Sequence, residues 1–499
     1  MQTQIEALST RAERPQAVAL TRANLLAIAL ILAVGVLHLA TIRAGHEWGD
    51  DFSLYIHHAK NIVEGRPYED TGYIYNPFWP GYSPRAYPPV FPLLLAPVYA
   101  LYGLDLMPMK VEVILFFIAA LVVVYLTFGR YLSTAATLAL LALIGLNPYI
   151  WDFKDSINSE MPFIFFLYLS LYLIDQAYRA ADGTRVPSGY TAAVGLAIYL
   201  AYGTRTLGIL LLPCLLLYDL LRFRRLSPFA LRVAGLVLAC AAVQRLFVQG
   251  DSSYLDQLGG DLSVVAGNFS EYRLAFTMFW YEGYPRIVRT PLFVLLALLA
   301  LFGYVMRLRR GPTVFELLPI PYLAVILVWS FYQGNRFLLP LVPLFVFYVM
   351  FGLRSLSAVR LGRLEPALLA LLTVMTLGAY ITQIPRQEYP ALSEGVGTRE
   401  AAELFEYIRS TTEPDDVIVF QKARALSLYT GRPAASYHVT DDDQELWGFI
   451  RSIDAAYVVT SREELFRDRE FFNGFIARHQ AQLEPVYANA EFSVYRIRE

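Results

Sequence analysis

Long apolar runs constrain this chain more than any other feature of its 499 residues. A helix needs roughly 20 apolar residues to cross a bilayer core about 30 Å thick. About twelve runs approach this length, and they occupy residues 22–42, 88–103, 110–129, 132–149, 160–178, 189–206, 207–221, 229–248, 290–306, 314–332, 336–353 and 364–384. A backbone in lipid must satisfy its own hydrogen bonds. The pattern therefore predicts a mainly α-helical, polytopic membrane protein.

The run at 88–103 differs from the others because it is short and rich in proline. Pro88, Pro89, Pro92 and Pro97 remove backbone donors that lipid cannot replace. We therefore expect this run to lie at the membrane interface, which leaves about eleven transmembrane helices.

The basic residues test this topology independently, because loops left in the cytoplasm collect Lys and Arg. With about eleven spans, the basic clusters all fall on one side of the membrane. These clusters are Arg11, Arg14 and Arg22; Arg130; Arg179 and Arg185; Arg222, Arg224 and Arg225; Arg307, Arg309 and Arg310; and Arg354, Arg360 and Arg363. The charge bias predicts a cytoplasmic N-terminal tail over residues 1–21. The polar segments 43–87, 150–159 and 249–289 would then face outward.

The chain changes character after the last apolar run. Residues 385–499 combine amphipathic helical periods with short strand patterns at 417–420 and 456–460. They predict a small soluble α/β domain outside the cytoplasm, after a membrane domain at 22–384. This region contains neither a phosphate loop nor a nucleophile elbow, so we expect it to serve recognition or assembly.

Charge and cysteine content exclude several classes of function. The chain carries 41 Lys and Arg against 43 Asp and Glu, so it has no overall basic field with which to bind nucleic acid. Cys214 and Cys240 both lie in apolar runs, which predicts neither a disulfide framework nor a thiolate metal site. No metal-ligand spacing is present, so we expect no metal and no cofactor.

The first outer segment begins with "HEWGDDFSLYIHHAKNIVEGRPY", whose apolar residues recur at helical spacing. It predicts an amphipathic interfacial helix that starts at Asp50 or Asp51 and is capped by Gly65. A carboxylate at this start can cap the helix or serve as a rigidly held base, and the two roles are compatible. His57 and His58 are adjacent and face different ways, so we expect polar-face residues rather than a metal pair.

Further ionisable residues lie at the same membrane level. The aromatic residues around 73–82 fit an interfacial belt: they are Tyr73, Tyr75, Trp79 and Tyr82. Arg85 follows them and can snorkel or bind a lipid phosphate. Glu160 lies just inside a predicted helix, where a charge is costly unless it faces protein or water. Together with Lys154, Arg205 and Arg336, these residues predict a charged rim at the outer surface, whereas transporters usually bind their substrates at the midplane.

The order of four motifs on this face points to a family. "GDDFSLYIHHAKNIVEG", "YPPVFPLLLAPVYALYG", "SEMPFIFF" and "RFLLPLVPLF" follow one another along the chain. In this order the chain resembles the GT-C glycosyltransferases, in particular the bacterial branch related to protein O-mannosyltransferases and to the enzymes that add aminoarabinose to lipid A. The resemblance covers roughly residues 22–384. It implies an enzyme of the bacterial plasma (inner) membrane that moves a sugar from a polyprenyl-phosphate carrier to an outer-face acceptor, which can be a lipid, a glycan or a protein.

The resemblance also implies roles for single residues. The family's base is an acidic residue at the start of the first outer-loop helix, which maps to Asp50 or Asp51. Spacing to Gly65 favours Asp50, whereas the phrase "DFSLYI" favours Asp51, and we select Asp51. Glu160 matches a second acidic position, which would orient the acceptor or support the site.

One position departs from the family pattern. Tyr87 stands where the lipid A enzymes carry a lysine, so phosphate binding at this position is in doubt. Four other cations could take over this role: Arg85, Lys154, Arg205 and Arg336.

Two other classes of function compete with the transferase. A transporter or flippase of lipid-linked sugars would use the charged rim as a headgroup port and would not require an acid at Asp50 or Asp51. A receptor-like protein would need none of the rim charges and would present its long loops to a partner.

Overall fold

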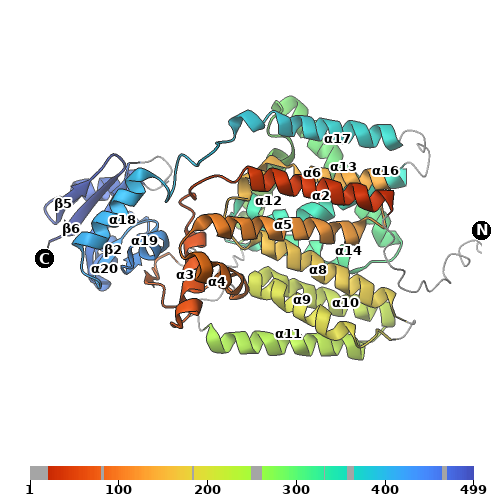
Figure 1. Cartoon of the computed structure of the whole chain (residues 1–499), viewed down its shortest axis with the longest axis horizontal. Coiled ribbons are helices and arrows are strands. Elements are labelled where there is room, and N and C mark those ends of the chain that lie inside the picture. Colours follow the sequence, from red (N-terminus) through yellow and green to blue (C-terminus); the bar gives the residue numbers. More distant parts are fainter. Residues whose placement is uncertain are drawn as a thin grey trace, which may run out of the picture.

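The computed structural model describes residues 21–79, 84–181, 185–248, 261–330, 332–356, 365–462 and 469–498. It consists of a helical bundle and a smaller region that carries a six-stranded sheet at one end of the bundle (Figure 1). The predicted tail up to residue 20, together with Tyr82, Arg360 and Arg363, lies outside the described residues.

Eight helical segments among the described residues are long and apolar enough to cross a membrane. They are α2 (Arg22–Ala40), α5 (Leu106–Phe128), α8 (Glu160–Arg179), Thr206–Phe223 with α10 (Leu211–Phe223), α11 (Pro228–Phe247), α13 (Arg286–Arg309), Leu339–Leu356 with α16 (Val342–Leu356), and Glu365–Arg386 with α17 (Glu365–Ile381). The structure confirms that the chain is mainly α-helical and that several of its helices are long and apolar enough to cross a membrane. The count of about eleven spans stays a prediction.

Shorter helices complete the bundle. The proline-rich run forms α4 (Val90–Tyr102), an apolar helix of 13 residues that is shorter than the eight candidate spans. α6 (Thr134–Gly145), α7 (Pro148–Phe153), α9 (Tyr190–Thr204), α14 (Val314–Leu317) and α15 (Pro319–Val328) are also short. α12 (Leu262–Tyr281) is a 20-residue helix in the segment 249–289, where the sequence predicted only an outer loop.

Polar residues define where several of these helices begin. The Asp105 carboxylate accepts a hydrogen bond from the Met107 N–H at the start of α5. The Asn147 side chain accepts from the N–H groups of Tyr149 and Ile150 at the start of α7. Such caps satisfy backbone donors that have no partner within the helix.

The first outer segment forms α3 (Asp50–Glu64), which begins at Asp50 and ends at Gly65 in a left-handed conformation, as predicted. Figure 1 shows α3 between the bundle and the sheet-bearing region. Its polar face is covered by protein instead of open to water, and His57 and His58 are both buried. His58 is covered by the same outer segment, because its ring stacks on Tyr68 with 4.1 Å between the ring centroids.

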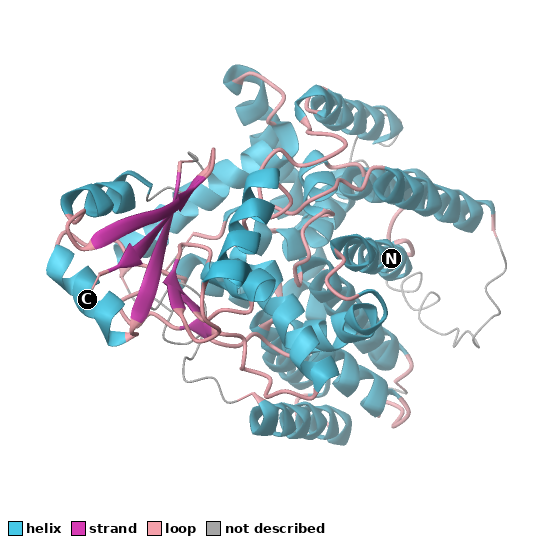
Figure 2. Ribbon diagram, turned by 60° about the vertical axis from the view of Figure 1, so that its left-hand side comes forward, coloured by secondary structure: helices cyan, strands magenta, loops and turns pink. Residues whose placement is uncertain are grey.

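The C-terminal region contains both strands predicted from its sequence. β2 (Val417–Val419) and β4 (Ala455–Ser461) lie side by side and parallel. The sheet order is β1-β3-β2-β4-β6-β5, with β3 (Ala434–Ala435), β5 (Leu483–Ala488) and β6 (Phe492–Ile497) also from this region (Figure 2). Four helices flank it: α18 (Arg399–Thr411), α19 (Ala423–Thr430), α20 (Asp443–Ser452) and α21 (Arg469–Arg478).

The first strand of this sheet comes from the other end of the chain. β1 (Tyr73–Ile74) belongs to the first outer segment and pairs in parallel with β3, with Tyr73 opposite Ala434. Tyr73 is therefore a buried strand residue and not part of an exposed aromatic belt. Close to it, the Asn76 amide donates to the Ser436 carbonyl (2.9 Å) and contacts Nδ1 of His438 (3.1 Å). The sheet thus ties the first outer segment to the C-terminal region.

Replacing Asn76 tests this connection. Asn76→Ala leaves the buried Ser436 carbonyl without this donor, and we expect a loss of about 1–3 kcal/mol in unfolding free energy. Thermal unfolding of the purified protein measures the loss, and limited proteolysis reports release of the first outer segment. Gln444→Ala, at an exposed position on α20, is the control. Equal melting temperatures for both variants would contradict the coupling.

Candidate active site

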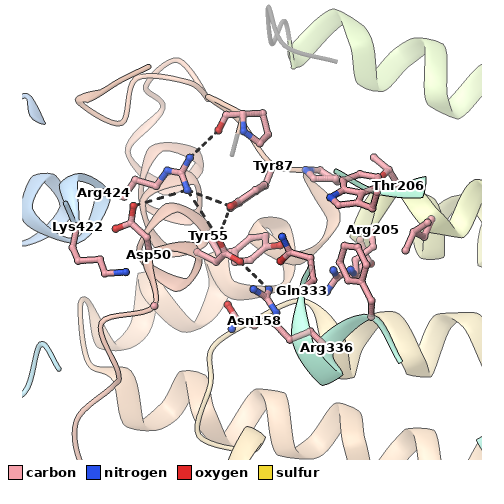
Figure 3. Close-up of a pocket in the computed structure, with 18 residues that line it drawn as sticks. Asp50, Tyr55, Tyr87, Asn158, Arg205, Thr206, Gln333, Arg336, Lys422 and Arg424 are labelled. Atoms are coloured by element: carbon pink, nitrogen blue, oxygen red, sulfur yellow. Dashed lines mark hydrogen bonds and ion pairs between the residues drawn. The ribbon is translucent and has the colours of Figure 1, made fainter. Parts of the chain in front are cut away.

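A cavity of about 300 Å³ lies where the bundle meets the C-terminal region (Figure 3). Segments far apart in the sequence line it: the start of α3, the stretch before α4, the end of α9, the short 3₁₀ helix η3 (Gly334–Phe337), and the start of α19 with the residue before it. Its charged and hydrogen-bonding side chains include Asp50, Asp51, Tyr55, Tyr87, Asn158, Arg205, Arg336, Lys422 and Arg424. Five of the eight candidates from the sequence thus line one cavity: Asp50, Asp51, Tyr87, Arg205 and Arg336.

Asp51 contacts groups from two other segments. Its Oδ1 accepts a hydrogen bond from the Tyr87 hydroxyl at 2.6 Å, and its Oδ2 lies 2.8 Å from Nη2 of Arg336. Burial opposes ionisation, but Arg336, the Tyr87 hydroxyl and Arg424 outweigh it and lower the pKa of the Asp51 carboxyl to about 2. The side chain is 23% exposed. Asp51 is therefore an ionised carboxylate that remains open to the cavity.

Asp50 has a different environment from its neighbour. It is 7% exposed, and its Oδ1 accepts from the Ala425 N–H at 3.3 Å, in the first turn of α19. Burial raises the pKa of the Asp50 carboxyl, although Arg424 and Lys422 act in the opposite direction. Gly49 occupies the N-cap position of α3, and no side chain caps that helix. Asp50 thus contacts the N-terminus of a helix from the other region instead of capping its own.

Glu160 joins two of the arginines. It is fully buried at the start of α8, and its Oε1 accepts from Nη1 of Arg205 and from Nε of Arg336, the latter at 2.6 Å. Arg336 therefore bridges Glu160 and Asp51. A buried carboxylate is costly unless it is paired, and here two guanidinium groups compensate it. Its Oε2 has no hydrogen-bond partner within the described part of the chain.

Tyr87 is held on several sides. Its ring stacks on Tyr55 at 4.7 Å between centroids, and its carbonyl accepts from the Tyr68 hydroxyl at 2.9 Å. Its N–H donates to Nε2 of His58 (3.3 Å), while Nδ1 of His58 donates to the Tyr68 carbonyl (2.8 Å). These contacts require the neutral imidazole, in keeping with the burial that lowers the pKa of His58 to about 3. His58 thus positions the tyrosine that contacts Asp51.

Arg424 is a residue that sequence reasoning missed. It is the second residue of α19 and only 2% exposed. Its guanidinium donates to the Tyr87 hydroxyl and to the Pro84 carbonyl, both at 3.3 Å, and lies 4.4 Å from the Tyr73 ring centroid. No motif in the sequence marks it, because it is more than 300 residues from the residues that it contacts. Lys422, two residues earlier, also lines the cavity.

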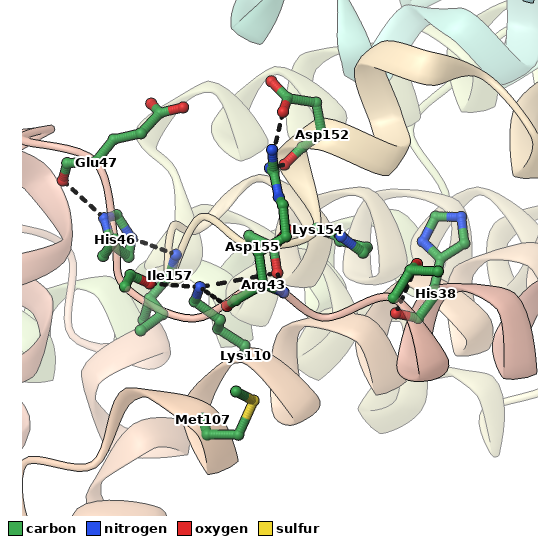
Figure 4. Close-up of polar contacts among 12 residues, drawn as sticks. His38, Arg43, His46, Glu47, Met107, Lys110, Asp152, Lys154, Asp155 and Ile157 are labelled. Atoms are coloured by element: carbon green, nitrogen blue, oxygen red, sulfur yellow. Dashed lines mark hydrogen bonds and ion pairs between the residues drawn. The ribbon is translucent and has the colours of Figure 1, made fainter. Parts of the chain in front are cut away.

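Three of the eight sequence candidates do not line this cavity: Glu160, which is fully buried behind the arginines that it contacts, Arg85 and Lys154. Arg85 is exposed, and its guanidinium lies 5.9 Å from the centre of the Tyr75 ring. Lys154 is buried in a second charged cluster, where its Nζ lies 2.5 Å from Oδ2 of Asp155 (Figure 4). Arg43 and Lys110 complete this cluster: Nε of Arg43 donates to Asp155 (2.6 Å), and Nζ of Lys110 donates to the Arg43 carbonyl (2.8 Å). These contacts anchor the segment that follows α2.

Comparison with known proteins supports the fold independently. No family model matches the sequence, and no curated protein matches it. Among solved structures, ArnT from Cupriavidus metallidurans bound to undecaprenyl phosphate superposes with a TM-score of 0.53 at 13% identity, over 95% of this chain and 97% of that one. The archaeal oligosaccharyltransferase AglB from Archaeoglobus fulgidus, in complex with an inhibitory peptide and a dolichol-phosphate, has a TM-score of 0.57 at 12% identity, over 89% of this chain and 70% of that one.

A third match is the arabinofuranosyltransferase AftD from Mycobacteria, with a TM-score of 0.52 at 12% identity, over 96% of this chain and 42% of that one. These proteins are GT-C glycosyltransferases. The chain therefore shares the fold of these solved structures, which is the fold that the order of its sequence motifs led us to expect.

Proposed function

We propose that this protein transfers a sugar from a polyprenyl-phosphate carrier to an acceptor hydroxyl at the outer face of the plasma membrane. The observation that carries the proposal is one cavity in which an ionised Asp51 lies beside Arg205, Arg336 and Arg424. The reaction needs both an acceptor for a proton and stabilisation for a leaving phosphate. The undecaprenyl phosphate in ArnT and the dolichol-phosphate in AglB support this class of carrier. The outer face is favoured by the distribution of basic residues along the sequence.

Asp51 is the group we assign as general base. The acceptor oxygen bonds to the anomeric carbon while the bond from that carbon to the phosphate oxygen breaks. The hydroxyl proton passes to Asp51, and the electron pair of the broken bond leaves with the phosphate. Asp51 is favoured over Asp50 because its carboxylate is the more open to the cavity, whereas Oδ1 of Asp50 is occupied by the Ala425 N–H.

The resting pKa of Asp51 makes it a weak base, and substrate binding offers a way to strengthen it. Arg336 is one cause of the low value. A carrier phosphate that binds Arg336 would compete with Asp51 for the guanidinium and would add negative charge nearby. Both effects raise the proton affinity of Asp51, which favours proton transfer only when the donor is in place.

Arg336 and Arg205 are the groups we assign to the leaving phosphate. Guanidinium groups bind phosphate with paired hydrogen bonds, and they stabilise the negative charge that develops on departure. Glu160 contacts both arginines and fixes their positions at the cavity. This geometry favours a supporting role for Glu160 over direct contact with the acceptor.

An apolar cavity of about 620 Å³ offers a place for the carrier's chain. It is lined by residues of α12, α13, α15 and α16, and Tyr272 lies on its wall. The Tyr272 hydroxyl accepts from the N–H of Gln333 at 3.4 Å, and Gln333 lines the charged cavity. The two cavities therefore lie close to each other, as a lipid with an apolar tail and a phosphate headgroup requires.

Paired carboxylate variants test the base. Parent, Asp51→Asn and Asp50→Asn proteins are reconstituted in liposomes with radiolabelled polyprenyl-phosphate-linked sugars and a bacterial membrane extract as the source of acceptors. We expect Asp51→Asn to lower transfer by about 10²–10⁴-fold, because the proton acceptor is lost. Asp50→Asn should retain more activity, and melting temperatures check folding.

Two outcomes would overturn this assignment. Full activity of Asp51→Asn would show that Asp51 is not the general base. If the parent and both variants moved the lipid-linked sugar across the bilayer without transferring it, the flippase function would replace the transferase.

Arginine variants test the phosphate site. We expect Arg336→Met to weaken binding of undecaprenyl phosphate to the purified protein and to lower transfer by about 10²–10³-fold, because a charge-stabilising donor is lost. Arg85→Met, outside the cavity, should bind like the parent. Equal weakening by the two variants would place the phosphate elsewhere.

A further inference from the structure

The C-terminal region extends a charged side chain into the candidate active site. Arg424 leaves the start of α19, and Figure 3 shows it with Lys422 on the side of the cavity opposite Arg205 and Thr206. Its side chain is almost completely removed from water. A buried guanidinium is costly unless it is paired and hydrogen-bonded. The partners of Arg424 therefore explain why it is tolerated there.

Those partners are the components of the site itself. Nη1 of Arg424 lies 4.0 Å from Oδ2 of Asp50 and 4.0 Å from Oδ1 of Asp51. Two adjacent carboxylates repel each other when both are ionised. Arg424 faces both, so it offsets their repulsion from one position.

Arg424 also acts on Asp51 through a hydrogen-bond relay. Its Nη1 donates to the Tyr87 hydroxyl, and that hydroxyl donates to Oδ1 of Asp51. Because the tyrosine oxygen accepts from a cation, its own proton is directed to the carboxylate. The relay leaves Oδ2 of Asp51 oriented toward Arg336 and the cavity.

Independent contacts hold Arg424 in this place. The first turn of α19 donates its Ala425 N–H to Asp50, which places the positive end of that helix at the carboxylates. The pairing of β1 with β3 and the Asn76 contacts secure the same region from the side of the first outer segment. The position of Arg424 thus follows from a docked domain and not from one flexible side chain.

We propose that Arg424 is a positioning residue of the catalytic site, which orients Tyr87 and Asp51 and balances the charge of the Asp50–Asp51 pair. The C-terminal region is then a required part of the centre and not a separate recognition module. This inference rests on the proposed transferase function for its kinetic consequences, but its electrostatic consequence can be measured without any transfer.

The electrostatic test follows the ionisation of Asp50 and Asp51. Among the described residues, the titratable and charged groups that act on the pair include Arg424, Lys422, Arg336, Tyr87, Tyr73 and Tyr55. Removing the Arg424 cation favours the protonated carboxyls, so their titration moves to higher pH. Infrared difference spectra of the full-length protein, recorded during acid titration, measure the protonation of these carboxyls. Spectra of Asp50→Asn and Asp51→Asn assign each band to its residue.

We expect Arg424→Met to shift the titration midpoint upward by about one pH unit or more. Arg424→Lys, which keeps the charge, should remain close to the parent. Arg399→Met is the matched control, because Arg399 lies on α18 of the same region and its side chain is 86% exposed. An unchanged midpoint in Arg424→Met would overturn the inference whether or not the protein is a transferase. If Arg424→Met does not fold, Arg424→Gln gives the same measurement.

The kinetic test separates positioning from folding. In the liposome assay we expect Arg424→Met to lower kcat by about 10–100-fold with a smaller change in KM, and to move the acid limb of the pH profile upward. Adding Asp50→Asn to Arg424→Met should restore part of the lost rate, because the unbalanced charge is then gone. Parent-like kcat and pH profile in Arg424→Met, together with an inactive Asp51→Asn, would overturn the positioning role. An inactive parent with a shifted midpoint would instead count against the transferase function alone.

Discussion

Charge compensation at one end of a helical bundle is the constraint on which this structure depends. Asp50, Asp51 and Glu160 are carboxylates largely removed from water, and each needs positive charge close by. Arg336 pairs with Asp51 and Glu160. Arg424 faces Asp50 and Asp51. The bundle, the first outer segment and the C-terminal region must all be in place for this balance to exist.

This dependence gives the C-terminal region a role that its fold alone does not suggest. A small α/β domain without catalytic motifs is usually a recognition or assembly module. Here the sheet includes β1 from the first outer segment, and α19 begins against Asp50. Movement of the domain would therefore change both the shape and the charge of the cavity.

The second charged cluster shows how similar residues serve different purposes. Arg43, Lys110 and Lys154 surround Asp155 within the protein, and the residues of this cluster hold the chain between α2 and α3. From the sequence, Lys154 and Arg205 were equally good candidates for binding a phosphate. The structure separates them, because Lys154 is buried against Asp155 and the Trp151 ring, whereas Arg205 lines the cavity.

The sequence by itself determined the mainly helical, membrane-spanning class, the α/β character of the last region, and the start of α3 at the Asp50–Asp51 pair. These follow from local patterns: apolar runs, strand and helix periodicity, and a closing Gly65. It also selected Asp50, Asp51, Glu160, Arg205 and Arg336 as candidates, because a charged group at a membrane boundary is costly unless it faces protein or water. Only the tertiary structure decided which cations meet these acids, the burial of His57 and His58, the placement of Tyr73 in a sheet, and the part played by Arg424. Contacts between residues hundreds of positions apart depend on how helices pack and domains dock, and no local pattern in one sequence encodes them.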